Sequence, residues 1–119
     1  MLTKLYGTQS GEFLIFFTEL IEKLNERAMQ LLKIKDTESS YELLVWCENA
    51  TVQGAYGDFS KLRNITLNNL GCLYRRVGKL KQAINCLREA LSTLQKSNNM
   101  IDSANTYLNL SAVLSQWGK

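Results

Sequence analysis

The stretch LNNLGCLYRRVG at residues 67–78 decides the fold, because the chain repeats it 40 residues later as YLNLSAVLSQWG at residues 107–118. Both copies place apolar residues, an asparagine followed by a leucine, a small residue and a final glycine at the same spacing. Apolar residues three and four positions apart share one face of a helix, so each copy predicts an amphipathic helix that ends at its glycine. A repeated helix of this kind indicates a structure built from stacked helical units.

The same periodicity continues outward from these two copies and predicts five helices, with no strand pattern of period two. Ser39 and Glu42 form a capping box that predicts the start of the second helix. Ser10 and Asp58 are expected to cap the first and third helices, and Gly78 to end the third in the left-handed conformation. The expected helices span residues 12–35, 39–50, 59–77, 80–96 and 101–117.

Residues 67–91 resemble the tetratricopeptide repeat family. The residues that carry the resemblance are Leu67, Leu70, Gly71, Tyr74, Gly78, Ala83, Leu87 and Ala90. The small residues Gly71 and Ala83 let two antiparallel helices approach closely, and Leu87 fills the space between them. The repeat is 40 residues long, against the usual 34, and lacks the family's proline after the second helix. In its length the repeat is similar to the long-repeat subgroup of kinesin light chains and Pins-type adaptors, and the phrase TLNNL at 66–70 also resembles that subgroup.

The resemblance implies an all-α solenoid of antiparallel helix pairs, with about five helices in two and a half repeats. Residues 1–10 form an N-terminal segment outside it, and residues 11–119 form one domain. Within that domain, 11–57 is a degenerate repeat, 58–97 a well-matched repeat and 98–119 the first helix of an incomplete repeat. The last helix should therefore expose an apolar face, which a longer array or another chain would cover.

Composition excludes several classes of function. The 119 residues include no histidine and no proline, so imidazole catalysis and histidine metal ligation are excluded. Cys47, Cys72 and Cys86 are odd in number and form no Cys-x-x-Cys pair, which predicts buried thiols in a reducing, cytoplasmic compartment, without disulfides or zinc. No signal peptide is visible. The apolar run 13–17 is too short to cross a membrane and predicts a buried helix or a packing surface for another subunit.

Charge divides the chain into two halves. Residues 1–60 hold five basic and nine acidic residues, a net charge of −4, and residues 61–119 hold nine basic and two acidic residues, a net charge of +7. A positive second half favours acidic partners. Because aromatic residues are not interleaved with the basic ones and no nucleic-acid motif is present, the pattern argues for a protein ligand over a nucleic acid.

The resemblance further implies that the first helix of each pair lines a concave groove. The candidate partner-binding residues are Asn68, Asn69, Cys72, Arg75, Arg76, Asn109, Val113 and Gln116. In the family, an asparagine at the positions of Asn69 and Asn109 hydrogen-bonds the backbone of an extended peptide; the alternative is an ordinary helix-surface asparagine. Arg75 and Arg76 either bind carboxylates or simply complement the end of their helix.

The sequence holds no phosphate-binding loop, nucleophile–base pair or clustered carboxylates, so we expect neither catalysis nor a cofactor nor a metal. The leading hypothesis is a scaffold or adaptor that binds a peptide or helix, with acidic ligands favoured, in the concave groove. The alternative is a permanent structural subunit of a large assembly, for example cytoskeletal or ciliary, whose terminal helix docks on a partner chain.

Overall fold

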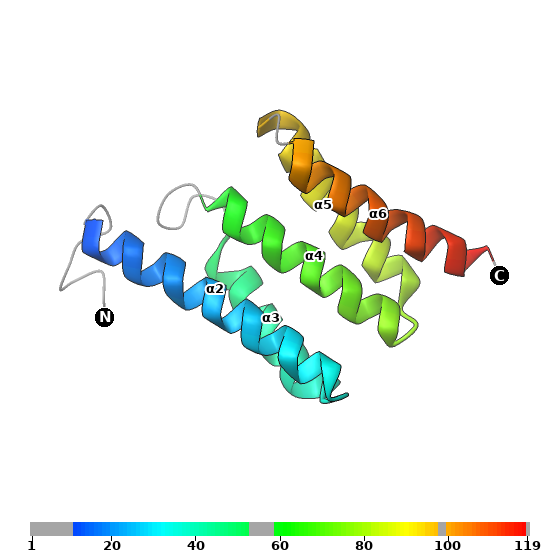
Figure 1. Cartoon of the computed structure of the whole chain (residues 1–119), viewed down its shortest axis with the longest axis horizontal. Coiled ribbons are helices and arrows are strands. Elements are labelled where there is room, and N and C mark those ends of the chain that lie inside the picture. The colour runs from blue at the N-terminus through cyan, green and yellow to red at the C-terminus, as the bar shows by residue number, and fades with distance from the viewer. Residues whose placement is uncertain (1–10, 53–58, 98–99, 119) are drawn as a thin grey trace.

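The structure of the chain is a computed structural model that describes residues 11–52, 59–97 and 100–118. These residues form five α-helices and no strand (Figure 1), which confirms the predicted all-α class. The helices are α2 (Gly11–Lys33), α3 (Thr37–Ala50), α4 (Ser60–Arg76), α5 (Leu80–Ser97) and α6 (Met100–Trp117). Every helix begins and ends within two residues of its expected position. The segment 1–10 and the expected caps Ser10 and Asp58 lie outside the described residues.

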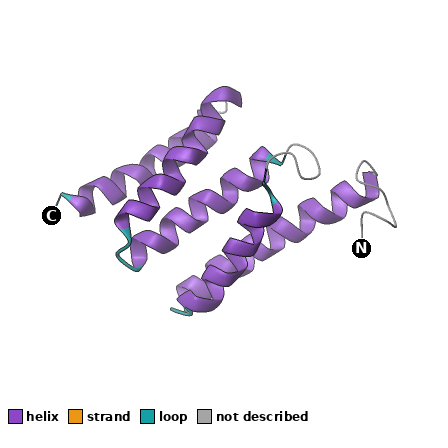
Figure 2. Cartoon of the chain, turned by 180° about the vertical axis from the view of Figure 1, so that it is seen from behind, coloured by secondary structure: helices purple, strands orange, loops and turns teal. Residues whose placement is uncertain are grey.

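The helices form two layers. In Figure 1, α2, α4 and α6 lie side by side nearer the viewer, and α3 and α5 lie behind them; Figure 2 shows the second layer from its own side. Each helix packs against the next one along the chain, and α4 also packs against α2 and α6. The chain is thus an elongated array, 52 × 33 × 19 Å, of the pairs α2/α3 and α4/α5 with α6 stacked on the second pair.

Three apolar clusters follow one another along the array. The first joins the start of α2 to the end of α3 and the start of α4, the second lies among the same three helices further along, and the third joins α5 to α6. Their buried members are Phe13, Phe17, Ile21, Cys47, Phe59 and Leu62; Ala28, Leu32, Leu44, Leu70 and Leu73; and Ala83, Leu87 and Val113. Tyr74 packs against both the second and the third cluster, so α4 is the central helix of the core.

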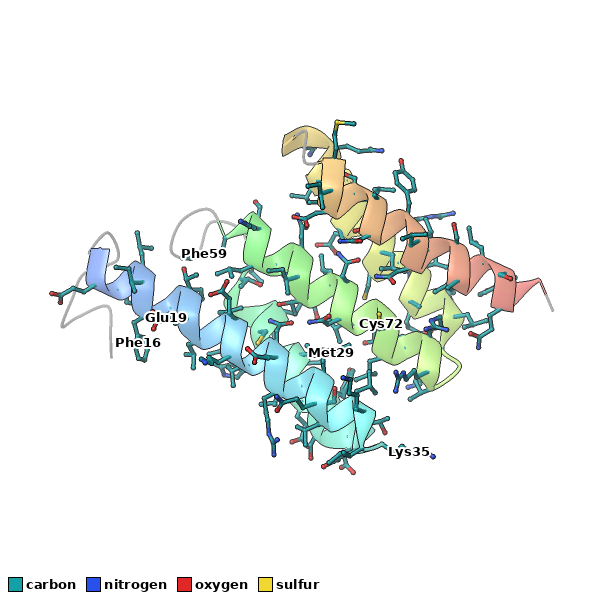
Figure 3. The ribbon with its side chains drawn as sticks, in the orientation of Figure 1. Phe16, Glu19, Met29, Lys35, Phe59 and Cys72 are labelled. Carbon is teal, nitrogen blue, oxygen red and sulfur yellow. The ribbon has the colours of Figure 1, made fainter. Side chains whose placement is uncertain are left out.

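The apolar run at 13–17 is only half buried. Phe13 and Phe17 enter the first cluster, where the ring of Phe17 lies 4.6 Å from that of Phe59. Phe16 is half exposed, and Figure 3 shows it on the side of α2 away from α4. The prediction of a buried helix therefore holds for the positions that face α3 and α4, and the remaining apolar residues of the run face solvent.

Close contact between α4 and α5 depends on Gly71. A Cβ added at this glycine would lie 2.7 Å from Cδ2 and 2.8 Å from Cγ of Leu87. Such distances are well inside van der Waals contact, and Leu87 is fully buried and has no room to withdraw. The predicted roles of Gly71 and Leu87, close approach and filling of the space between the helices, are confirmed.

The turn between α2 and α3 differs from the sequence prediction. The backbone N–H of Asp36 donates to the carbonyl of Leu31 at 2.9 Å and that of Lys35 to Leu32 at 3.1 Å, with Lys35 at a φ of 68°. Asp36 then caps α3, because its Oδ1 accepts the backbone N–H of Ser39 at 3.2 Å. The predicted capping box at Ser39 is wrong: a carboxylate cap, which the helix dipole also favours, starts the helix two residues earlier.

Gly78 ends α4 as predicted. Its φ is 82°, the left-handed conformation, which costs a glycine little. The backbone N–H of Lys79 donates to the carbonyl of Tyr74 at 2.8 Å, and that of Gly78 donates to Arg75 at 3.1 Å. These two bonds close the helix and turn the chain directly into α5.

Candidate functional site

A buried polar cluster joins α2 to α4. Asn25 is 2% exposed, and its Nδ2 donates to Oγ1 of Thr66 and to the carbonyl of Ile21, both at 3.0 Å. Its Oδ1 accepts a hydrogen bond from Nδ2 of Asn69 at 2.9 Å. An amide side chain has an NH2 group that donates and an oxygen that accepts, and both groups of Asn25 have hydrogen-bond partners. The cluster fixes the register of α4 along α2.

The same three residue types meet between α4 and α6, with the threonine now donating to the asparagine. Oδ1 of Asn68 accepts from Oγ1 of Thr106 at 3.1 Å and from Nδ2 of Asn109 at 3.3 Å. Thr106 and Asn109 stand 40 residues after Thr66 and Asn69, and Asn68 stands 43 residues after Asn25. The asparagine–threonine–asparagine cluster is thus part of the repeat and lies in each seam between successive first helices.

Three of the predicted groove residues therefore have partners inside the chain. Asn68, Asn69 and Asn109 lie in the seams and hold neighbouring helices together. Their contact with a peptide backbone stays a prediction, and a ligand would compete with these bonds. Asn25 and Thr66 belong to the same clusters but were missed as site residues. The sequence contains the signal: the degenerate repeat aligns with the well-matched one at an offset of 43 residues, at which Leu24 pairs with Leu67, Leu44 with Leu87 and Asn25 with Asn68.

Val113 is not a groove residue. Its side chain is 1% exposed and packs in the third cluster with Ala83 and Leu87 of α5. The position 40 residues earlier is Leu73, which is also buried. The prediction is wrong because the side chain at this position points toward the core between the helices. Successive residues lie about 100° apart around a helix axis, so core-facing and solvent-facing positions adjoin.

The remaining predicted residues lie at or near the surface. Cys72 is half-buried, and Figure 3 shows it on the viewer's side of the layer formed by α2, α4 and α6. Burial raises the pKa of its thiol, and the positive charges of Arg75 and Arg76 oppose that effect. Arg76 Nη1 also donates to the carbonyl of Leu32 at 3.4 Å, which ties the end of α4 to α2. Gln116 is exposed on α6.

Of the other two thiols, Cys47 is buried and Cys86 is half-buried. Cys47, Cys72 and Cys86 are all unpaired. Burial raises the pKa of the Cys47 thiol to about 11. Burial also raises the pKa of Cys86 to about 11, helped by the carboxylates of Glu48 and Glu89. A thiol that stays protonated at neutral pH is a poor nucleophile, so these two cysteines act as small apolar residues in the folded chain.

One apolar face of α6 is uncovered by the described residues. We define the open α6 face as Tyr107, Ser111 and Leu114, which stand 40 residues after Leu67, Gly71 and Tyr74. Leu67 is 1% exposed, whereas Tyr107 and Leu114 are each 48% exposed, and Ser111 is exposed where Gly71 is buried. The expectation that the last helix shows an apolar face holds for these residues. None of them was among the predicted site residues, although the repeat alignment identifies them.

Polar residues of α5 border this open α6 face. Nε2 of Gln95 donates to the hydroxyl of Tyr107 at 3.1 Å, which places Gln95 at the edge of the face. Lys81 and Arg88 precede Gln95 by two and one seven-residue steps, so all three share one side of α5. Lys81, Arg88 and Gln95 are exposed. We call these three residues the α5 stripe.

The equivalent border between the first and second pairs is an ionic cluster. Arg63 Nη2 lies 3.0 Å from a carboxylate oxygen of Glu89 on α5 and 3.7 Å from one of Glu48 on α3. Arg63 Nη1 also donates to the backbone carbonyl of Glu48 at 2.7 Å. One guanidinium thus joins three helices. The residue 40 positions after Arg63 is Ser103, so this charge is not repeated beside α6.

No protein-family model matches this chain, and neither a curated protein nor a solved structure matches it. Among the described residues, no group of three or more histidine, cysteine, aspartate or glutamate side chains is placed to hold a metal ion. Of the helices in the described ranges, none is both long and apolar enough to span a membrane. The described surface thus offers the seams, the α4 surface around Cys72 and the open α6 face as places for a ligand.

Proposed function

We propose that this chain is a non-catalytic protein-interaction scaffold of the tetratricopeptide-like kind, which holds a partner protein on the open α6 face. One observation carries the proposal: Tyr107 and Leu114 are half exposed, while of their repeat equivalents on α4 Leu67 is buried and Tyr74 packs with Ala83 and Leu87 of α5. Large apolar side chains grouped on one face of a helix mark a surface that another element covers. This form of the proposal is closest to the alternative of a permanent subunit in a larger assembly.

The low charge of α6 supports the same function. Residues 100–117 contain a single charged side chain, Asp102, whereas α2 of the same array carries seven charged residues in 23. Centres of protein interfaces are depleted in charged residues and enriched in large aromatic and apolar ones. An apolar, nearly uncharged helix at the edge of the array suits a lasting contact better than contact with water.

The experiment is affinity capture by wild type and by a Leu114→Glu variant, with the bound proteins identified by mass spectrometry. A scaffold of this kind should recover a stoichiometric partner that the Leu114→Glu variant loses. Ser115→Glu is the matched control, because Ser115 is exposed on α6 outside the open face and should retain the partner. Equal recovery by wild type and Leu114→Glu would contradict the proposal.

A second candidate is an acidic peptide bound along α4 in the first-helix layer. The observation that favours it is the charge of α4: residues 60–76 hold Lys61, Arg63, Arg75 and Arg76 and no acidic residue. Paired guanidinium groups bind carboxylates strongly. Exchange of Arg75 and Arg76 for glutamate should weaken binding of such a ligand at least tenfold, and unchanged affinity would exclude it.

A further inference from the structure

The internal repeat indicates which kind of element fits the open α6 face. On α4, two of the equivalent residues are covered by α5: Leu87 lies against Gly71, and Ala83 and Leu87 pack with Tyr74. Figure 1 shows α6 at one edge of the array with α5 as its neighbour. A helix placed on α6 as α5 is placed on α4 would run antiparallel to α6 and cover Tyr107, Ser111 and Leu114.

Ser111 restricts the side chain that this helix can carry. At Gly71, an added Cβ would lie 2.7 Å from a methyl carbon of Leu87. Ser111 has a Cβ at the repeat-equivalent position, so a leucine in the place of Leu87 cannot fit against it in this geometry. Alanine or glycine, which lack the γ and δ carbons, would fit. The helix bound to α6 must therefore differ from α5 at this one position.

The α5 stripe sets the charge of the bound helix. By the repeat, the edge of such a helix that faces α5 corresponds to the edge of α5 that carries Glu89, whose carboxylate shares Arg63 with Glu48 of α3. Lys81 and Arg88 line the facing side of α5 and are exposed. Acidic residues along that edge would meet two positive charges, and basic residues there would be repelled.

We propose that the open α6 face binds an amphipathic helix of a partner protein, with alanine or glycine opposite Ser111 and acidic side chains along the edge beside Lys81 and Arg88. This inference rests on the proposed function and specifies the partner's chemistry. A second copy of this chain is a poor occupant, because its α5 presents Leu87 to Ser111 and carries Lys96 on the same edge as Glu89. The partner helix thus has the apolar pattern of α5, but a smaller side chain opposite Ser111 and more acidic side chains along the edge that faces Lys81 and Arg88.

The probe is a synthetic peptide with the sequence of residues 80–97, carrying Leu87→Ala for size and Gln82→Glu and Lys96→Glu for charge. A second peptide keeps Leu87 and is otherwise identical. Fluorescence anisotropy measures the affinity of each peptide for the purified 119-residue chain. We expect the alanine peptide to bind wild type at least tenfold more tightly than the leucine peptide. Equal affinities, or tighter binding of the leucine peptide, would overturn the proposal.

Two variants of Ser111 test whether its Cβ causes that preference. Ser111→Gly removes the Cβ, so affinity for the leucine peptide should rise at least fivefold. Ser111→Ala keeps the Cβ and loses the hydroxyl, so the wild-type preference should remain. Circular dichroism verifies that both variants are folded. An unchanged ratio of affinities in Ser111→Gly would overturn the geometry on which the inference rests.

The charge requirement has its own test. Arg88→Glu should weaken binding of the alanine peptide at least tenfold at low salt, whereas Lys33→Glu, at the end of α2, should leave it unchanged. Light scattering gives the mass of the wild-type chain, which should be that of a monomer. A dimer that Leu114→Glu dissociates would mean that a second copy covers the face, and would overturn the choice of occupant.

The two levels of the proposal can fail separately. Capture of a partner that is lost in Leu114→Glu but indifferent to Ser111→Gly would uphold the scaffold function and overturn the proposed helix geometry. Peptide binding that follows the predicted size and charge preferences supports the geometry, whatever partner is captured.

Discussion

Burial of the Ser40 hydroxyl lowers the free energy of unfolding. Its Oγ is fully buried and has no hydrogen-bond partner among the described residues. The repeat-equivalent residue, 43 positions later, is Ala83, which needs none. Ser40→Ala should raise the free energy of unfolding by about 1 kcal/mol, because it removes an unsatisfied hydroxyl. Urea denaturation measures this, with Ser92→Ala at an exposed position of α5 as control for helix propensity. A less stable Ser40→Ala variant would contradict the prediction.

Asn25 should be among the most costly polar residues to remove. Asn25→Ala deletes three hydrogen bonds, two of them across the seam, and leaves Thr66 and the amide of Asn69 without their α2 partner. We expect a loss of about 2–4 kcal/mol in the free energy of unfolding. Asn85→Ala, at an exposed position of α5, is the control and should change stability by less than about 0.5 kcal/mol. A loss for Asn25→Ala as small as that of the control would show that the seam contributes little.

The seam positions mark the limit of prediction at the residue scale. Helical spacing correctly placed Asn69 and Val113 on helices, but not on the right side of them. Successive residues differ by about 100° around a helix axis, and the seam, the core and the free surface of a first helix occupy adjacent sectors. How far the neighbouring helix reaches around that axis depends on the crossing geometry, which the pattern of a single sequence does not contain.

At the scale of elements, the turn at Lys35 offers a simple stabilisation. Lys35 has a φ of 68°, a conformation that costs a side chain with a Cβ about 1 kcal/mol. Lys35→Gly should therefore raise the free energy of unfolding by up to about 1 kcal/mol, while Lys33→Gly, within α2, should lower it by a similar amount. Thermal or urea unfolding of the two variants checks the sign of each change. A destabilised Lys35→Gly variant would contradict the role given to this turn.

The contact between α4 and α5 makes a second prediction at this scale. Gly71→Ala should destabilise the chain by about 1–3 kcal/mol, because its Cβ would overlap fully buried Leu87. Ser111→Ala, at the repeat-equivalent position on the open face, should be neutral or slightly stabilising, since alanine is the better helix former. Urea denaturation of both variants tests the pair. Similar losses at both positions would mean that helix propensity, and not contact with Leu87, governs Gly71.

Helix number, order and ends were predictable because long segments of period 3.6 and glycine stops are local signals. The start of α3 was not, because two capping residues compete within four positions. Asp36 prevails over Ser39 since the turn that ends α2 places Asp36 directly at the next helix start. That turn depends on a lysine in the left-handed conformation, for which the sequence carries no signal comparable to a glycine.

At the scale of the whole molecule, the array is held by contacts that pass through α4. The first two clusters, both seams and the Arg63 ionic cluster all include residues of α4. Loss of this helix would expose the apolar faces of both pairs at once. We therefore expect the described helices α2 to α5 to unfold together, with α6, which has few buried residues of its own, as the least protected helix.

The raised pKa values of two thiols make the stability of the whole chain depend on pH under alkaline conditions. The pKa values of Cys47 and Cys86 are about 11 in the folded chain, against an ordinary value of 9.0. Below pH 9 both states are protonated and the full stability is present. Above pH 9 the unfolded thiols ionise while the folded ones stay neutral, so stability falls toward pH 11. The free energy of unfolding should drop by about 1 kcal/mol per thiol between pH 8 and 10.

Urea denaturation at pH 8, 9 and 10 under reducing conditions measures this fall, and the variants assign it. Cys47→Ala and Cys86→Ala should each flatten the dependence on pH, whatever they do to stability at pH 8, because alanine cannot ionise. All other titratable groups are the same in the three proteins. If both variants lose stability with the same slope as wild type, the thiols are not the groups that couple folding to pH, and the two cysteines are less buried in solution than the packing of α3 and α5 implies.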